Sequence, residues 1–132
     1  MNQQAKGIFK VTIKPAVNPD AFEGVTLGRM SIDKQFQGDL VGIGEGEMLT
    51  AMTDVEGSAG YVAIERVSGT LHGRAGSFVF QHTGTMNRGA QELTITVVPD
   101  SGAGALVGIS GRFVIAVVDG VHHYTFDYAL PQ

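Results

Sequence analysis

Three side chains that could perform acid–base chemistry, Glu47, Arg66 and His82, lie in three different runs of alternating apolar and polar residues. If these runs are adjacent strands with one shared inner face, a carboxylate, a guanidinium and an imidazole meet among apolar residues. Glu47 or His82 would then serve as general base or acid, and Arg66 would hold a substrate oxyanion. The alternative is a satisfied polar plug that fixes strand register without chemistry, because a buried charge needs a partner in either case.

Other polar and aromatic residues of the predicted inner face are candidates for contact with a ligand. Glu45 lies two residues before Glu47 and therefore faces the same side; the alternative places it at the rim, toward Lys34. The aromatic residues of the last run could be core, although a buried tyrosine hydroxyl needs a partner and could offer a hydrogen bond to a ligand. The predicted ligand contacts are Glu45, Tyr124, Tyr128, His122, Phe80 and Phe113.

Neither a metal site nor a cofactor is predicted. The chain has no cysteine, and the neighbouring His122 and His123 must point to opposite faces of a strand. The glycine-rich residues 42–46 belong to a strand, with their glycines on the predicted outer face, and no helix follows them. They therefore lack the context of a phosphate-binding loop, and a bend or the close approach of another backbone explains them better.

The elements that would position these residues are strands. Apolar and polar residues alternate with a period of two along most of the chain, and clusters of Gly, Pro, Asn or Asp separate the runs. Eight antiparallel strands joined mostly by tight turns predict one domain over residues 1–132. We expect an all-β, up-and-down barrel, since closure removes exposed sheet edges. The expected strands cover residues 6–14, 26–37, 40–53, 60–71, 77–86, 92–98, 111–118 and 121–130.

The turn at Asp119 and Gly120 predicts the register of the last hairpin. An Asp-Gly pair suits a two-residue type I′ turn, which matches the twist of the flanking strands. Counting outward from this turn places Phe113 opposite Phe126 on a largely apolar face.

The turn at residues 38–39 predicts the register of the candidate cluster. A two-residue type II′ turn there places Glu47 opposite Met30 on the inner face. Apolar continuity through the next two turns then places Glu47 opposite Arg66, and Arg66 opposite His82. A slip by one residue would move such side chains to the other face.

The predicted outer face is not uniformly polar. The same count places Met48, Tyr61, Val67 and Val79 on it. An apolar outer face is commonly covered by another subunit, so we expect a homo-oligomer.

Composition and charge exclude several classes of partner. The chain carries 9 basic and 13 acidic side chains, a formal charge of −4, which argues against nucleic-acid binding. Its first residues have no apolar run of signal-peptide type, and no apolar stretch approaches the ~20 residues of a spanning helix. We therefore expect a cytoplasmic protein that has no membrane partner.

Residues 59–74 and 76–86, with the sequences AGYVAIERVSGTLHGR and GSFVFQHTGTM, resemble a bacterial domain of unknown function, number 3224. Further matching pieces are GEML at 46–49, VVPDSG at 97–102 and YTFDY at 124–128. The resemblance extends from about Ile8 to Pro131, and it implies a fold similar to the allene oxide cyclase-like barrels. It implies no activity, since the family has none agreed. The wider group includes enzymes that bind apolar, oxidised lipid-like substrates and steer a cyclisation.

Two functions follow for a barrel that binds a small apolar or aromatic molecule. The first is a cofactor-free isomerase or cyclase, in which Glu47 moves a proton and Arg66 stabilises negative charge. The second is a non-catalytic carrier or sensor, suggested by the lack of a reaction-specific motif. A third possibility is a structural oligomer with a filled barrel. An open lumen favours the first two, and a lumen filled with side chains favours the third.

Overall fold

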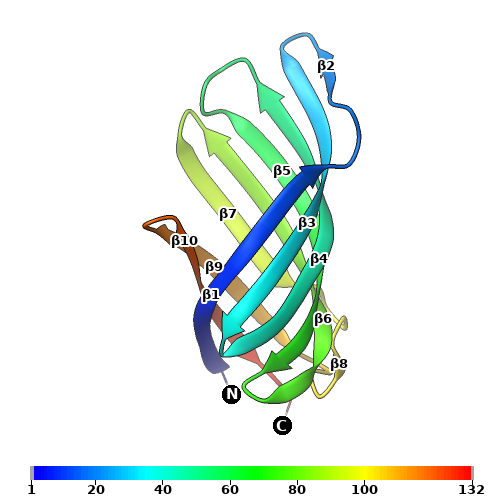
Figure 1. The fold of residues 1–132 in the computed structure, drawn as a ribbon, viewed down its shortest axis with the longest axis vertical. Coiled ribbons are helices and arrows are strands. Elements are labelled where there is room, and N and C mark those ends of the chain that lie inside the picture. The colour runs from blue at the N-terminus through cyan, green and yellow to red at the C-terminus, as the bar shows by residue number, and fades with distance from the viewer. Residues whose placement is uncertain (1, 132) are drawn as a thin grey trace.

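The computed structural model describes residues 2–131, which form strands and turns without a helix (Figure 1). None of the described residues therefore belongs to a helix that could cross a membrane. The strands are β1 (Asn2–Pro15), β2 (Asp20–Phe22), β3 (Val25–Gly38), β4 (Leu40–Thr53), β5 (Ala59–Leu71), β6 (Arg74–Asn87), β7 (Ala90–Val97), β8 (Ala103–Gly104), β9 (Ser110–Val118) and β10 (Val121–Ala129).

The strands close into an antiparallel barrel of eight with up-and-down order, which confirms the predicted fold (Figure 1). β1 closes the ring by pairing with β10 on one side and with β3 on the other. The two short strands lie outside the ring, where β2 extends β3 and β8 pairs with β6. β7 and β9 are neighbours in the ring but share a single residue pair, Thr96 with Arg112.

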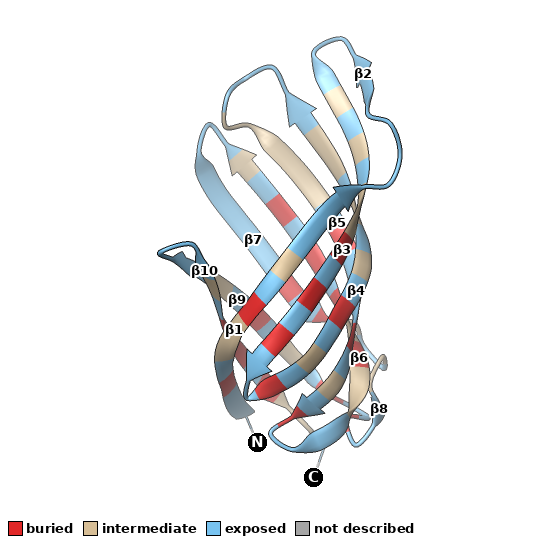
Figure 2. Ribbon diagram, in the orientation of Figure 1, coloured by how far each residue is buried: buried red, intermediate tan, exposed pale blue. Residues whose placement is uncertain are grey.

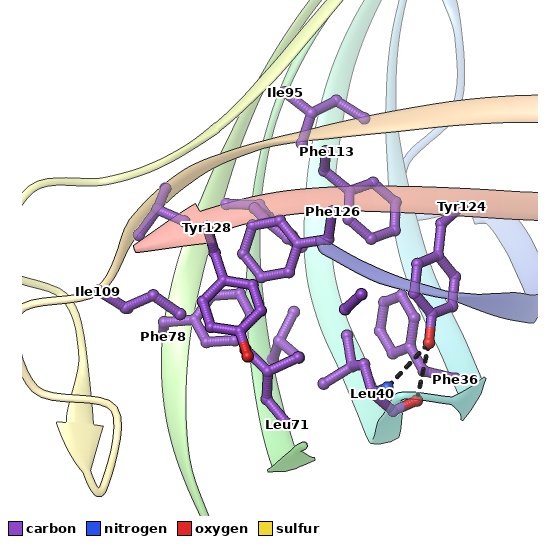
Figure 3. Packing of buried hydrophobic residues seen from close by; sticks show 14 of the residues in the cluster. Phe36, Leu40, Leu71, Phe78, Ile95, Ile109, Phe113, Tyr124, Phe126 and Tyr128 are labelled. Carbon is purple, nitrogen blue, oxygen red and sulfur yellow. Dashed lines mark hydrogen bonds between the residues drawn. The ribbon is translucent and has the colours of Figure 1, made fainter. Parts of the chain in front are cut away.

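The barrel has two unlike halves. We call the part with both termini and the turns after β3 and β5 the closed half, and the part with the turns after β4 and β6 the open half. Buried residues gather in the closed half, whereas the far ends of β3 to β7 are mostly exposed (Figure 2). Rings and aliphatic side chains fill the closed half (Figure 3). Those with 2% or less exposure include Phe36, Leu40, Leu71, Phe78, Phe80, Ile95, Leu106, Ile109, Phe113, Tyr124, Phe126 and Tyr128.

The turn between β9 and β10 has the predicted conformation. Asp119 and Gly120 both have positive φ, 51° and 77°, as a type I′ turn requires. Phe113 lies opposite Phe126, so the predicted register of this hairpin is confirmed.

The turn between β3 and β4 differs from the prediction by one residue. Glu47 lies opposite Ser31 instead of Met30, and Met30 lies opposite Met48. Every side chain of β4 therefore faces the side opposite to the predicted one, since neighbouring residues of a strand alternate between faces.

A tertiary contact accounts for this difference. The Tyr124 hydroxyl from β10 accepts a hydrogen bond from the Leu40 N–H at 2.9 Å and donates one to the Gln37 carbonyl at 2.9 Å. The N–H of Asp39 donates to the Lys6 carbonyl at 3.0 Å. Residues 38–40 therefore wrap around the tyrosine, and these bonds outweigh the local preference for a two-residue turn.

The corrected register also reverses β5. Val67 is buried inside the barrel, and Met48 and Tyr61 lie on the same inner side, contrary to the prediction. Val79 alone of the four stays on the outer face. Three of the four residues that suggested a homo-oligomer therefore face inward, and the exposed apolar residues of the outer face are others, among them Leu49, Val62 and Ile64.

The glycines of residues 42–46 lie on the inner face, not the outer one. A Cβ on Gly42 would collide with the Ser68 carbonyl and Gly69, and one on Gly46 would collide with the Ile64 carbonyl. The close approach of another backbone therefore explains these two positions.

Candidate functional site

The open half contains a cavity of about 290 Å³ on the inner side of the barrel wall. This volume is near the lower limit for small-molecule sites and suits a ligand the size of one or two rings. Three methionines give it a soft, adaptable apolar lining. The principal inward-facing residues around it are Met48, Met52, Met86, Leu93, Thr50 and Tyr61.

A chain of four polar side chains crosses the barrel interior beside this cavity, and we call it the inner polar chain. Tyr61 Oη lies 3.3 Å from His82 Nδ1, and His82 Nε2 lies 2.9 Å from Glu65 Oε1. Lys34 Nζ donates to the same carboxylate oxygen at 3.0 Å. Glu65 is completely buried, and His82 and Lys34 are almost so. Only Tyr61 reaches the cavity, so it connects the buried charges to the hollow space.

The carboxylate of Glu65 is held in its ionised form. Burial alone would raise the pKa of Glu65, but the hydrogen bond from His82 and the charge of Lys34 outweigh it, so the pKa is lowered. The ammonium of Lys34 also lies 4.8 Å from the centre of the Phe9 ring, a cation–π contact. The barrel interior thus holds a paired negative and positive charge.

Burial and the nearby Glu65 charge raise the pKa of Tyr61. Its hydroxyl therefore stays protonated across the physiological range. While His82 is neutral, its Nε2 donates to Glu65 and its Nδ1 accepts the proton of the Tyr61 hydroxyl. The lone pairs of the Tyr61 oxygen are then free to accept a hydrogen bond from another molecule.

Two inner glycines make room for members of the inner polar chain. A Cβ on Gly44 would collide with Glu65 Oε2, and a Cβ on Gly84 would collide with the Tyr61 ring. Glu65 Oε2 is buried without a hydrogen-bond partner among the described residues. The missing side chain at Gly44 therefore provides the space that this oxygen occupies.

The predicted cluster of Glu47, Arg66 and His82 does not form. Glu47 points outward and makes an exposed ion pair with Arg29 at 3.3 Å. Arg66 lies opposite Glu45 on β4 and is also on the outer face. Of the three predicted catalytic residues, the structure places only His82 inside the barrel.

The predicted ligand contacts divide between the core and the surface. Phe80, Phe113, Tyr124 and Tyr128 are buried in the aromatic core, and none of them lines the cavity. Figure 3 shows Phe113, Tyr124 and Tyr128 in this core. Their rings contact one another; Phe113 and Tyr124, for example, stack with centroids 5.2 Å apart.

The two remaining predicted contacts also lie away from the cavity. His122 is half-buried against Phe9, at 5.1 Å between ring centroids. Glu45 is on the outer face opposite Asp33, a reversal that follows from the corrected turn. The inner position of Glu45 and its neighbour Glu47 was therefore predicted wrongly.

Sequence reasoning missed Lys34, Glu65 and Tyr61. A signal existed for Lys34, because Ile32 and Phe36 on either side of it were assigned to the inner face. No such signal existed for Glu65, whose neighbours Ile64 and Val62 are larger and more apolar than the inward-facing Ala63. The apolar pattern of β5 therefore favoured the wrong face.

A second chain of tyrosine, histidine and carboxylate lies at the rim of the closed half, and we call it the rim chain. His72 Nδ1 forms a hydrogen bond with the Tyr128 hydroxyl, and His72 Nε2 lies 3.5 Å from Asp39 Oδ2. Asp39 Oδ2 also accepts from the Lys6 N–H at 2.8 Å. The rim chain thus ties together β1, β10 and the turns after β3 and β5.

The described residues contain no group of three or more His, Asp or Glu side chains that could hold a metal ion. The family described as "Protein of unknown function (DUF3224)" matches residues 5–128. The chain belongs to the DUF3224 family. A crystal structure of a DUF3224 protein of unknown function from Shewanella oneidensis MR-1 is 47% identical, with a TM-score of 0.95. The match covers 100% of this chain and 99% of that one, so the two share the whole barrel. A search of curated proteins finds no match.

Membership of DUF3224 agrees with the resemblance of the segments at 59–74 and 76–86. The family description assigns no activity to its members.

Proposed function

We propose that this DUF3224 protein binds a small apolar or aromatic molecule in the open half of its barrel. The observation that carries the proposal is the juxtaposition of a hollow, methionine-lined cavity with a buried ion pair, through Tyr61. Buried charges are costly and are kept where they fix structure or perform a function. The closed half is already filled with rings, which leaves the open half for a ligand.

The inner polar chain supports a ligand that carries one polar hydrogen. When the Tyr61 hydroxyl donates its hydrogen bond to His82 Nδ1, the tyrosine oxygen can still accept a hydrogen bond from a ligand. A phenol, alcohol or amine hydrogen on the ligand would satisfy it, while the methionine wall would contact the apolar part. Binding without chemistry would make the protein a carrier or sensor in the cytoplasm, with neither nucleic acid nor membrane as partner.

The connectivity of the chain also supports a second candidate, a cofactor-free isomerase. A substrate proton could move to the Tyr61 oxygen as the hydroxyl proton moves to His82 Nδ1, and the imidazolium would then lie beside the Glu65 carboxylate. This role replaces the predicted one for Glu47 and Arg66. A fold similar to the allene oxide cyclase-like barrels is compatible with either candidate.

Binding is tested with 1-naphthol and, as a matched control, naphthalene, which has the same rings without the hydroxyl. The chain has no tryptophan, so naphthol fluorescence is unobscured. Tyr61→Phe should weaken naphthol binding several-fold, as loss of one hydrogen bond worth about 1 kcal/mol predicts, and should leave naphthalene binding unchanged. Methyl signals of Met48, Met52 and Met86 should shift in the NMR spectrum, and the Leu71 amide should not. Failure of both probes to shift these methyls contradicts the proposal.

Catalysis is tested with 2-tetralone, an aromatic ketone with exchangeable α-protons. In deuterated water, the isomerase candidate predicts faster deuterium uptake with the wild type than with His82→Gln or Tyr61→Phe, measured by mass spectrometry. Equal uptake with all three proteins, together with normal naphthol binding, leaves the carrier or sensor as the function.

A further inference from the structure

β7 and β9 separate beyond their single residue pair, and of the two edges left unpaired there the edge of β9 is the more apolar. β9 meets β7 only at Arg112 and Thr96, and from Phe113 to Val118 it pairs with β10 alone. The hairpin of β9 and β10 projects away from the tips of β3 to β7, and no other strand in the described part of the chain pairs with this edge (Figure 1).

The composition of this edge is that of an interface strand. Residues 113–118 read FVIAVV, without a charge, a proline or a glycine. Natural sheets protect free edges with charges, prolines or bulges, because an unprotected edge recruits another strand. The edge is also accessible on both faces, with Val114 48% and Val117 60% exposed.

The hydrogen-bond pattern shows which groups are available. A two-residue turn closes on a hydrogen-bonded pair, Val118 with Val121, and bonded and non-bonded pairs then alternate along the ladder. The N–H and C=O groups of Ile115 and Val117, and the C=O of Phe113, therefore point away from β10 and are free. The Phe113 N–H also points away from β10, but the pair of Thr96 with Arg112 directs it to β7. A two-fold axis at Ile115 would pair Ile115 with itself and the Val117 N–H with the Phe113 C=O.

We propose that this edge pairs with β9 of a second copy of the chain, antiparallel about a two-fold axis near Ile115. The partner strand must have a free edge and apolar side chains on both faces, and β9 itself meets both requirements. Self-pairing in this register sets Phe113 opposite Val117 of the partner subunit, and it brings no charge into the ladder. Closed two-fold pairing is also the commonest symmetry of soluble oligomers.

A rival surface exists on the outer face of the barrel. Leu49, Val62 and Ile64 are each more than half exposed there, beside the ion pair of Arg29 and Glu47. This face belongs to strands whose edges are already paired, so it could bind a partner only through side chains. Its involvement would be an alternative outcome of the same experiment.

The test is the molar mass of the full chain in solution, by size-exclusion chromatography with light scattering. The wild type should be a dimer at micromolar concentration, and Val117→Lys should be a monomer with an unchanged circular dichroism spectrum. Ile64→Lys, at a position 53% exposed, should remain a dimer. A monomeric wild type overturns the proposal, as does a result in which Ile64→Lys alone dissociates.

A second measurement avoids any effect of lysine on folding. The chain has no cysteine, so Ile115→Cys introduces a single thiol at the proposed axis. Mild oxidation should crosslink it to a covalent dimer, since facing residues lie within disulfide range. Val41→Cys, on the doubly paired β4 and more exposed than Ile115, should crosslink far less. Equal crosslinking of both variants overturns the proposal.

Discussion

Each half of the barrel contains a chain of a tyrosine, a histidine and a carboxylate, and the two chains differ in their surroundings. In the closed half, the rim chain of Tyr128, His72 and Asp39 lies at the edge of a packed aromatic core and joins turns to strands. In the open half, Tyr61, His82 and Glu65 lie inside the wall, and the tyrosine reaches a cavity. A tyrosine–histidine–carboxylate chain is therefore no functional signature by itself. The space beside it decides what it can do.

The difference also separates structural from functional burial. Tyr124 is buried with its hydroxyl fully engaged by the backbone of residues 37–40. Tyr61 is only partly buried, and its hydroxyl has one protein partner. The closed half thus has no hydrogen-bonding capacity left for a ligand at Tyr124, whereas the open half has some at Tyr61. This contrast predicts different responses to mutation in the two halves.

Truncating the aromatic core should produce the largest effect. Phe126 is completely buried, and its ring centroid lies 5.3 Å from that of Phe80 and 5.6 Å from that of Phe78. Phe126→Ala should lower the free energy of unfolding by about 3–5 kcal/mol, because it removes buried contacts and leaves a cavity. The matched change in the open half, Met52→Ala, should cost less than about 1 kcal/mol, since Met52 is 55% exposed. Urea denaturation measures both, and equal losses would remove the distinction between the halves.

A methyl group on the inner wall tests the seating of the inner polar chain. Gly44→Ala should lower the free energy of unfolding by about 1–3 kcal/mol, because the new Cβ displaces the Glu65 carboxylate. Gly60→Ala is the control, since a Cβ there would meet only ordinary contacts, the nearest at 3.7 Å. The free energy of unfolding of Gly60→Ala should equal or slightly exceed that of the wild type, because alanine restricts the unfolded chain more than glycine does. Equal stability of Gly44→Ala and Gly60→Ala would mean that Gly44 has no role in placing Glu65.

Removing one tyrosine hydroxyl from each half should have a smaller effect. Tyr124→Phe leaves the Leu40 N–H and the Gln37 carbonyl without their partner and should cost about 1–2 kcal/mol. Tyr61→Phe should cost less than about 1 kcal/mol, because its hydroxyl makes one bond of 3.3 Å in a partly exposed place. Thermal denaturation of the two variants decides the order, and a larger loss for Tyr61→Phe would assign it a structural role.

Acid should lower the stability of the folded chain by protonating the buried carboxylate of Glu65. The pKa of Glu65 is lowered in the folded chain, so its contribution to stability is present above its ordinary value of 4.5. This contribution is lost as the pH falls through the lowered pKa, because the unfolded chain binds the proton first. Glu65→Gln lacks the titration, and so the stability gap between wild type and variant should narrow on acidification. Denaturation at a series of acidic pH values measures the gap. A gap that is independent of pH would mean that folding leaves the pKa of Glu65 unchanged, and a gap that widens on acidification would mean that the fold holds Glu65 neutral.

Much of the fold was predictable because local signals agree with it. The alternation of apolar and polar residues indicated strands, and the Asp119 and Gly120 turn fixed the register of the last hairpin. The inner side of β6 was also predictable, because the two rings of Phe78 and Phe80 alternate with Val79 and the polar Gln81. His82 continues the side of the two rings. One site residue, His82, was therefore placed correctly inside the barrel.

The rest of the site was decided by contacts between residues far apart in the chain. The sequence by itself determined an antiparallel barrel, the last hairpin and an aromatic core, because each depends on a local period or turn. The tertiary structure alone decided that Tyr124 holds residues 38–40, and thereby which faces of β4 and β5 turn inward. It also decided that Glu65 could be buried, because Lys34 and His82 come from other strands to neutralise it. An apolar pattern cannot indicate this, since burial of a charge depends on partners that only folding brings within reach.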